Sequence, residues 1–110
     1  MNLRMTRGDT KFYKFRRRNK DHEIILEKAD KIYFTVKDLT KQILFQKTIE
    51  DMSFDEEGVY HFTIEPEDTD GIDFGDYEYD LEVIADGAKR TLALGMIKID
   101  KEVTYVQDEV

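Results

Sequence analysis

The chain has 110 residues, close to the commonest size of a single domain, and its lack of cysteine excludes disulfides and thiolate metal sites. Its formal net charge of −8 argues against nucleic acid as the main partner, and its 12% aromatic content argues against disorder. The sequence lacks the apolar segment of a signal peptide, and no apolar run approaches the ~20 residues of a membrane span. We therefore expect neither secretion by a signal peptide nor a membrane partner.

Segments in which apolar and polar residues alternate follow one another along the chain, and this period of two is typical of half-buried β-strands. Strands are predicted at residues 11–16, 24–26, 31–37, 42–49, 59–65, 76–85 and 90–99. In the last of these strands the apolar phase shifts across Gly95, which predicts a β-bulge at that residue.

Turn-forming residues separate the predicted strands. Gly58 predicts one hairpin, and Asp86-Gly87 predicts a second, tighter one. Pro66 predicts the start of a single helical turn. Seven or eight short strands separated by turns predict an all-β, immunoglobulin-like antiparallel β-sandwich, formed as one domain by residues 1–110. Its predicted core consists of nine side chains: Phe34, Val36, Phe62, Ile64, Tyr79, Leu81, Val83, Leu92 and Leu94.

Residues 63–83 carry nine acidic side chains and no lysine or arginine. Within them, Asp73, Gly75 and Tyr77 have the spacing of a tyrosine corner, in which the tyrosine hydroxyl binds upstream backbone. A plain strand start is the alternative. Tyr79 takes the position of the second core cysteine of antibody domains, where a buried tyrosine needs a partner for its hydroxyl.

A calcium site is the rival interpretation of the acidic stretch. Asp68, Asp70 and Asp73 supply the hard oxygen ligands that Ca²⁺ prefers. However, Gly71 stands at the fourth position of this stretch, and an EF-hand loop requires glycine at the sixth. We therefore expect these acids to be solvated and predict no bound metal.

The titratable residues give little indication of catalysis. His22 lies in a predicted turn and His61 on the polar side of a predicted strand, and the spacing identifies no third group that would make either a general base. The sequence contains no phosphate-binding glycine loop, nucleophile elbow or HExxH motif. We expect no enzymatic activity and no cofactor.

The charges are segregated along the chain. Residues 1–20 hold eight basic residues against one acidic residue, whereas residues 48–88 hold fifteen acidic residues and no lysine or arginine. Either these charges neutralise each other within the fold, or the basic strand of one copy meets the acidic surface of the next in a head-to-tail contact. The interface candidates are Arg16, Arg17, Arg18, Asp68, Asp70 and Asp73.

The arginine run at residues 16–18 follows three aromatic residues, a combination that also occurs on nucleic-acid-binding surfaces. On a strand, however, Arg16 and Arg18 point to one face and Arg17 to the other, which dilutes such a patch. Charged residues on an edge strand also prevent unwanted sheet pairing. We therefore interpret this strand as a protected edge or an inter-subunit contact and not as a nucleic-acid site.

Six stretches occur in a characteristic order: RGDTKFYKF, KIYFTVK, LFQKTI, YHFTIEPEDT, GDYEYDLEV and LALGMIKIDKEVT. Together they cover most of residues 6–104. This order resembles small prophage-encoded structural proteins, and in particular the immunoglobulin-like N-terminal domain of phage baseplate upper proteins. Each stretch is weak by itself, and the order and spacing carry the resemblance.

The resemblance implies a non-enzymatic building block of a phage tail or baseplate, located in the virion or the bacterial cytoplasm. Its partners would be other phage structural proteins or further copies in a homo-oligomer. A longer chain follows this domain in baseplate proteins, so a free-standing relative stays open. Two other functions also stay open. One is binding of carbohydrate or a host surface protein through Tyr13, Tyr33 or Tyr105, and the other is an acidic regulatory protein whose surface mimics nucleic acid.

Overall fold

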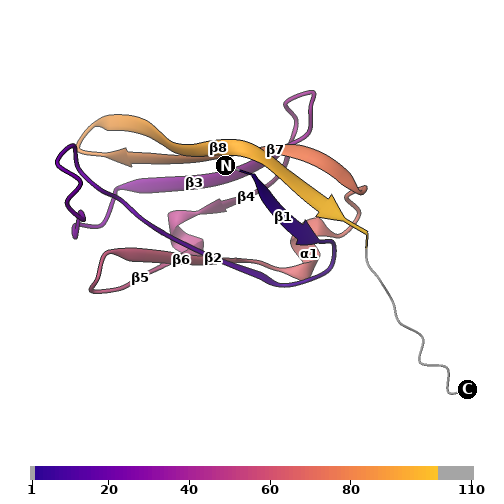
Figure 1. Ribbon diagram of the computed structural model, residues 1–110, viewed down its shortest axis with the longest axis horizontal. Coiled ribbons are helices and arrows are strands. Elements are labelled where there is room, and N and C mark those ends of the chain that lie inside the picture. Colours follow the sequence, from indigo (N-terminus) through magenta and orange to yellow (C-terminus); the bar gives the residue numbers. More distant parts are fainter. Residues whose placement is uncertain (1, 102–110) are drawn as a thin grey trace, which may run out of the picture.

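The computed structural model describes residues 2–101, which form two β-sheets packed face to face (Figure 1). The strands of the larger sheet are β1 (Leu3–Thr6), β3 (Lys31–Lys37), β4 (Ile43–Thr48), β7 (Gly75–Ala85) and β8 (Ala88–Asp100). Those of the smaller sheet are β2 (Lys11–Arg16), β5 (Ser53–Phe54) and β6 (Val59–Ile64). Two short helical turns, η1 (Ile49–Asp51) and α1 (Pro66–Thr69), connect strands of the two sheets. Neither turn is long or apolar enough to cross a membrane, and residues 2–101 contain no other helix.

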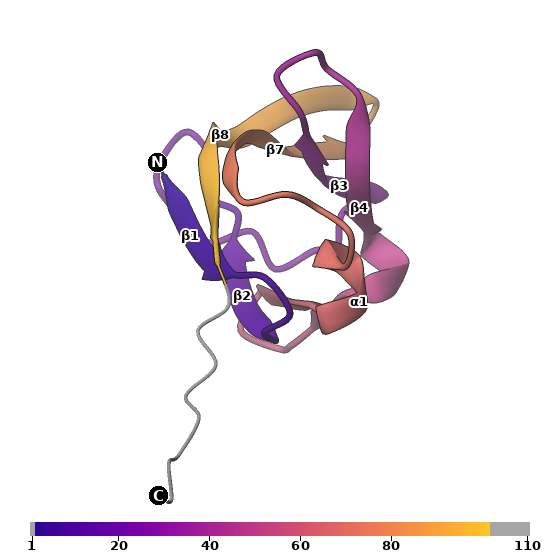
Figure 2. The ribbon, with the colours of Figure 1, turned by 90° about the vertical axis from the view of Figure 1, so that its right-hand side faces the viewer.

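The strand order is that of an immunoglobulin-like sandwich. The larger sheet runs β1–β8–β7–β3–β4 and the smaller runs β2–β6–β5. Strands β3, β7 and β8 thus occupy the C, F and G positions, β4 lies beside β3 as C′, and β2, β6 and β5 occupy B, E and D. Figure 2, viewed from one end, shows β2 and α1 below the strands of the larger sheet. The predicted fold class is confirmed.

One strand pair departs from the antiparallel pattern. Strand β1 pairs with β8 in parallel, with Leu3 opposite Ile97, and the larger sheet is therefore mixed. The sequence pattern did not predict β1 or β5, because four and two residues are too few to show an alternation. The strand predicted at residues 24–26 was wrong, since only an isolated bridge between Arg18 and Ile24 forms there.

The other six predicted strands and both predicted hairpins are present. The Asp86-Gly87 hairpin is a two-residue turn with φ values of 52° and 76°, because a type I′ turn requires positive φ at both residues. Pro66 begins α1 as predicted, since proline at the first helical position loses no backbone hydrogen bond. The backbone N–H of Glu65 donates to the Asp68 carboxylate at 2.7 Å and closes the start of this turn.

The core lies between the two sheets, and seven of the nine predicted core residues are buried there. Leu92 and Leu94 were predicted wrongly, because they are 39% and 66% exposed. The β-bulge lies at Leu92 and not at Gly95: Leu81 pairs with Ala93 while Glu82 pairs with Thr91. C-terminal to the bulge the inward face therefore belongs to the odd-numbered residues of β8, which include Ile97 and Ile99.

An aromatic cluster occupies the place where antibody domains have their inter-sheet disulfide. The ring of Phe34 on β3 packs against Tyr79 on β7 at a centroid distance of 5.7 Å and against Tyr13 on β2 at 6.3 Å. Phe62 on β6 adds a third contact to Phe34 at 4.9 Å. Antibody domains pack a strand C tryptophan on a B–F disulfide. Here aromatic contacts join the same strands without a cross-link.

Candidate protein-interaction surfaces

The tyrosine corner lies at the start of β7. The hydroxyl of Tyr77 donates to the backbone carbonyl of Asp73 at 2.6 Å, which is the hydrogen bond that the spacing predicted. Gly75, between them, has a φ of 150°, a value that side-chain-bearing residues rarely adopt. Burial first, and then the charge of Asp73, raise the pKa of Tyr77, so the phenol remains a hydrogen-bond donor at neutral pH. The corner therefore fixes how the acidic segment at residues 70–74 enters the sheet.

Replacing Tyr77 with phenylalanine is expected to lower the free energy of unfolding by about 0.5–1.5 kcal/mol, since it removes one intramolecular hydrogen bond. Urea unfolding followed by circular dichroism measures the change. The matched control is Tyr33→Phe, because the Tyr33 hydroxyl has no hydrogen bond within residues 2–101. Equal losses in the two variants would show that the corner hydrogen bond adds nothing.

The three candidate calcium ligands do not converge. The carboxylate of Asp68 pairs with the Lys47 ammonium at 2.6 Å and accepts from the Glu65 backbone at 2.7 Å, which commits it within the fold. Asp70 and Asp73 have exposed side chains. Across residues 2–101, no group of three or more acidic or histidine side chains is arranged to hold a metal ion. The acidic turn is thus available for contacts with solvent or with another protein.

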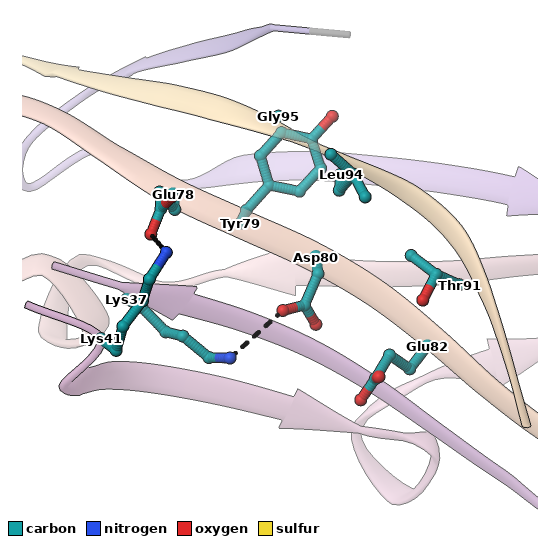
Figure 3. Close-up of a pocket in the computed structure, with 9 residues that line it drawn as sticks. All are labelled: Lys37, Lys41, Glu78, Tyr79, Asp80, Glu82, Thr91, Leu94 and Gly95. Atoms are coloured by element: carbon teal, nitrogen blue, oxygen red, sulfur yellow. Dashed lines mark hydrogen bonds and ion pairs between the residues drawn. The ribbon is translucent and has the colours of Figure 1, made fainter. Parts of the chain in front are cut away.

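The outward face of β7 is acidic, and lysines of neighbouring segments pair with its carboxylates (Figure 3). Lys41 binds Glu78 at 2.6 Å, Lys37 binds Asp80 at 3.4 Å, and Lys89 binds Glu82 at 3.4 Å. All of these groups except Lys89 line a shallow hollow of about 260 Å³. Because the pairs are solvent-exposed, each contributes little to stability. Part of the acidic stretch is therefore neutralised by the chain itself, as the first interpretation of the charge segregation expects.

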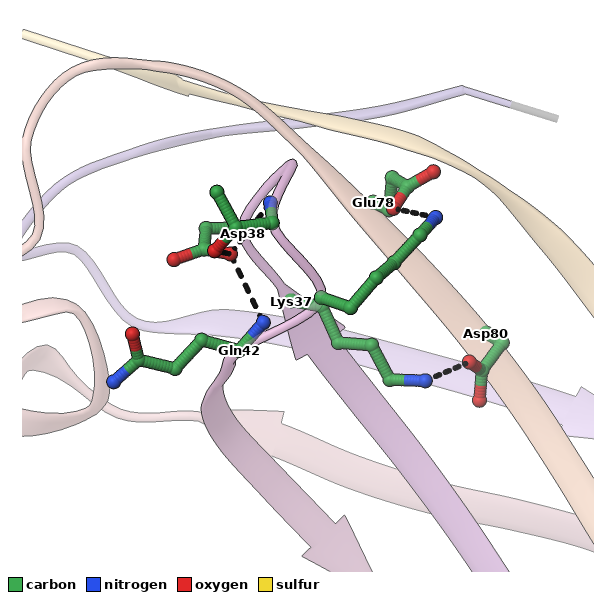
Figure 4. Close-up of polar contacts among 7 residues, drawn as sticks. Lys37, Asp38, Gln42, Glu78 and Asp80 are labelled. Atoms are coloured by element: carbon green, nitrogen blue, oxygen red, sulfur yellow. Dashed lines mark hydrogen bonds and ion pairs between the residues drawn. The ribbon is translucent and has the colours of Figure 1, made fainter.

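A tight turn between β3 and β4 places one of these lysines (Figure 4). The Asp38 carboxylate accepts from the Thr40 hydroxyl at 2.6 Å and from the Gln42 backbone N–H at 2.9 Å, and these bonds lower the pKa of Asp38. Lys41 adopts a left-handed backbone with φ of 75°. The turn thereby brings the Lys41 ammonium to the Glu78 carboxylate on β7.

The three arginines at the end of β2 and directly after it differ in exposure, as strand alternation predicted. Arg16 and Arg18 are exposed, whereas Arg17 is buried and donates from Nη2 to the Glu27 carbonyl at 2.7 Å. Arg18 donates to the His22 carbonyl at 2.9 Å. Strand β2 is an edge of the smaller sheet, as predicted.

The basic and acidic interface candidates lie at opposite ends of the sandwich. Arg16 pairs with Val59, the first residue of β6, while β6 ends at Ile64 and leads into α1 and the acidic segment after it. Six strand residues span roughly 20 Å. Figure 1 shows the same arrangement, with α1 and the start of β7 at one end of the molecule and the β7–β8 hairpin at the other. The basic run and the acidic segment therefore lie at different ends of the molecule.

The tyrosines considered for carbohydrate binding and the two histidines considered for catalysis do not gather at one place within the described residues. Tyr13 packs against Phe62 at 5.6 Å and Tyr33 is half-buried, while Tyr105 lies outside the described residues. His61 faces Asp55 at 3.1 Å on an exposed surface, and His22 is exposed in its turn. These residues thus form no common aromatic or catalytic cluster within residues 2–101.

A larger hollow of about 700 Å³ lies between the segment after β2 and the β7–β8 hairpin. Sequence reasoning identified Arg17 and Arg18 on its rim but missed Lys20 and Arg90. Arg17, Arg18 and Lys20 are close together in the sequence, but Arg90 lies far from them along the chain, and no local pattern links it to this run. The apolar pattern predicted the extra residue at Gly95, whereas β8 inserts it at Leu92.

No protein-family model matches the sequence, and no curated protein matches it. Solved structures that are similar in fold include the following two. CopC from Methylosinus trichosporium OB3b is 11% identical, with a TM-score of 0.53 over 96% of this chain and 89% of that one. The catalytic module of the multi-modular glycogen-degrading pneumococcal virulence factor SpuA is 18% identical, with a TM-score of 0.50 over 76% of this chain. This chain spans 10% of the length of that module, and the likenesses show the β-sandwich fold alone.

Proposed function

We propose that this protein is a non-enzymatic structural module that assembles through protein–protein contacts, as a component of the phage or prophage tail or baseplate type. The observation that carries the proposal is the placement of the basic run at residues 16–18 and of the acidic segment at residues 70–74 at opposite ends of one sandwich. Opposite charges at opposite ends favour head-to-tail contact between copies. The ordered resemblance to baseplate proteins supports the phage setting.

The charge distribution favours self-assembly over an internal role for the acidic segment. The β7 carboxylates of Glu78, Asp80 and Glu82 are paired within the chain, but Asp70 and Asp73 are exposed and have no ion pair within residues 2–101. Their partners would come from a neighbouring molecule. The charged residues of β2 protect this edge strand against non-specific sheet pairing.

Size-exclusion chromatography with light scattering, run on the full chain at low and at high salt, tests this proposal. We expect a defined oligomer or a mass that rises with concentration at low salt, and dissociation at high salt, because exposed charge pairs are screened. A monomer under every condition would contradict self-assembly. A salt-independent oligomer would show that the contact does not depend on the charged ends.

A further inference from the structure

The larger hollow has the composition of a binding groove for an acidic ligand with an apolar group. Four of the residues that line it are cationic and one is acidic: Arg17, Arg18, Lys20 and Arg90 against Asp86. Apolar side chains, among them Val83 and Leu92, form its floor. This local excess of positive charge occurs in a protein whose formal net charge is −8. A low-polarity floor beneath a cationic rim strengthens the attraction for carboxylates.

The bulge in β8 builds one wall of this groove. On the C-terminal side of the bulge, Ala93 faces inward opposite Leu81. On its N-terminal side, Arg90 lies opposite Val83 and therefore shares the inward face with that buried residue. Without the extra residue at Leu92, Arg90 would point to the outer face of the sheet, since side chains alternate along a strand. The irregularity thus places a cation beside the groove floor.

Arg17 on the other wall is unusual for a cationic side chain. It is 8% exposed, and within residues 2–101 its Nε–H has no hydrogen-bond partner and its guanidinium forms no ion pair. The Ile25 backbone N–H donates to the Arg17 carbonyl at 2.9 Å and holds this wall in place. Buried cations are normally paired, because an uncompensated charge away from water is costly. An anion in the groove would supply the missing counter-charge.

We infer that the groove receives the acidic segment at residues 70–74 of a second copy of this chain, an inference that rests on the proposed assembly function. This segment carries the exposed carboxylates of Asp70 and Asp73, and a third exposed carboxylate, that of Asp76, follows at the start of β7. Between them stands Phe74, which is 45% exposed and has the Arg7 guanidinium 4.4 Å above its ring. An aromatic side chain flanked by acids complements an apolar floor flanked by cations.

The position of the two surfaces determines the type of assembly. The groove lies at the hairpin end of the sandwich, and the acidic segment precedes β7 at the other end. A contact between unlike surfaces is heterologous, so each copy engages one neighbour through its groove and another through its acidic segment. Such a contact closes into a ring or continues as a filament. In this contact Phe74 is the apolar anchor and Arg90 is an accessible partner for the carboxylates.

The test compares the charge reversal Arg90→Glu with the matched reversal Lys14→Glu on the full chain, using sedimentation velocity over a range of concentrations at low salt. Both residues are exposed and both changes alter the net charge equally, but only Arg90 lines the groove. We expect Arg90→Glu and Phe74→Ala each to weaken association at least tenfold and Lys14→Glu to leave it nearly unchanged. Circular dichroism confirms that each variant is folded.

A charge-swap experiment separates this inference from the proposed function. Asp73→Arg alone should also weaken association, and mixing it with Arg90→Glu should restore assembly, because the reversed groove then meets a reversed segment. If the wild-type chain assembles in a salt-dependent way but Arg90→Glu and Phe74→Ala assemble equally well, the groove inference is wrong and the assembly proposal stands. If the wild-type chain is monomeric at every concentration, both self-assembly and groove docking are wrong.

Discussion

Replacing Tyr60 with alanine is expected to lower the free energy of unfolding by about 3–5 kcal/mol, the range measured for deletion of large aromatic side chains from cores. Tyr60 on β6 is among the largest fully buried side chains of the described structure. Its ring stacks on Phe15 at a centroid distance of 5.0 Å and contacts Phe54 at 4.4 Å, so it joins all three strands of the smaller sheet. Alanine would remove these contacts and leave a cavity.

The variant Tyr60→Phe separates the ring from its hydroxyl. The backbone N–H of Ala29 donates to the Tyr60 hydroxyl at 2.9 Å in a buried position. Phenylalanine keeps the ring contacts but leaves that N–H without a partner, which costs about 1–3 kcal/mol. Urea unfolding followed by far-UV circular dichroism should therefore rank wild type above Tyr60→Phe and Tyr60→Phe above Tyr60→Ala. If the two variants are equally stable, the hydrogen bond and not the ring contacts carries the effect.

A loss of this size approaches the whole stability of a small domain, about 5–15 kcal/mol. The smaller sheet has three strands, of which β5 has two residues, and it contributes few backbone pairs. Aromatic packing must therefore hold it against the larger sheet. Because the chain has no cysteine, the cluster around Phe34 provides inter-sheet contacts without depending on oxidation, and the stack on Tyr60 joins the strands within the smaller sheet.

The parts of the fold that depend on residues close together in the sequence were predictable. The alternation in β3, β6 and β7 extends over enough residues to define both the strand and its buried face. The Asp86-Gly87 hairpin and the corner at Tyr77 depend on spacings of one to four residues, which the sequence displays directly. Local chemistry was sufficient in each of these cases.

The groove could not be predicted in the same way, because it depends on contacts between distant segments. Arg17, in the segment after β2, and Arg90, on β8, line one hollow, and nothing in either local sequence indicates the other. The exposed state of Leu94 also depends on where β8 inserts its extra residue. The pairing of β8 with β7 determines where the extra residue is inserted. A leucine side chain by itself does not show which face of the strand is buried.

The two charge interpretations apply to different parts of the acidic stretch. Lysines from β3, from the turn after it and from β8 pair with the carboxylates of Glu78, Asp80 and Glu82 on the outward face of β7. The segment at residues 70–74 precedes that strand and lies beyond these lysines, at an end of the molecule. Sequence reasoning treated the stretch as one unit, whereas the sheet divides it into a neutralised face and an exposed acidic end.

The register of β8 leads to the second large effect. Replacing Ile97 with alanine is expected to lower the free energy of unfolding by about 2–5 kcal/mol, whereas Leu94→Ala is expected to change it by less than about 0.5 kcal/mol. Ile97 is fully buried opposite Tyr77, and Leu94 points outward opposite Asp80. The two residues are three positions apart on one strand and lose similar volumes, so they form a matched pair.

Chemical denaturation of both variants, with the denaturant dependence compared to that of the wild type, measures the difference. Large losses at both Leu94 and Ile97 would place the bulge at Gly95, as the apolar pattern predicted, because residues 93 and 94 would then exchange faces while Ile97 stays buried. Arg90 precedes both positions and faces inward in either case, so the cation of the groove does not depend on this outcome. The two variants therefore test the register of β8 and the extent of the core.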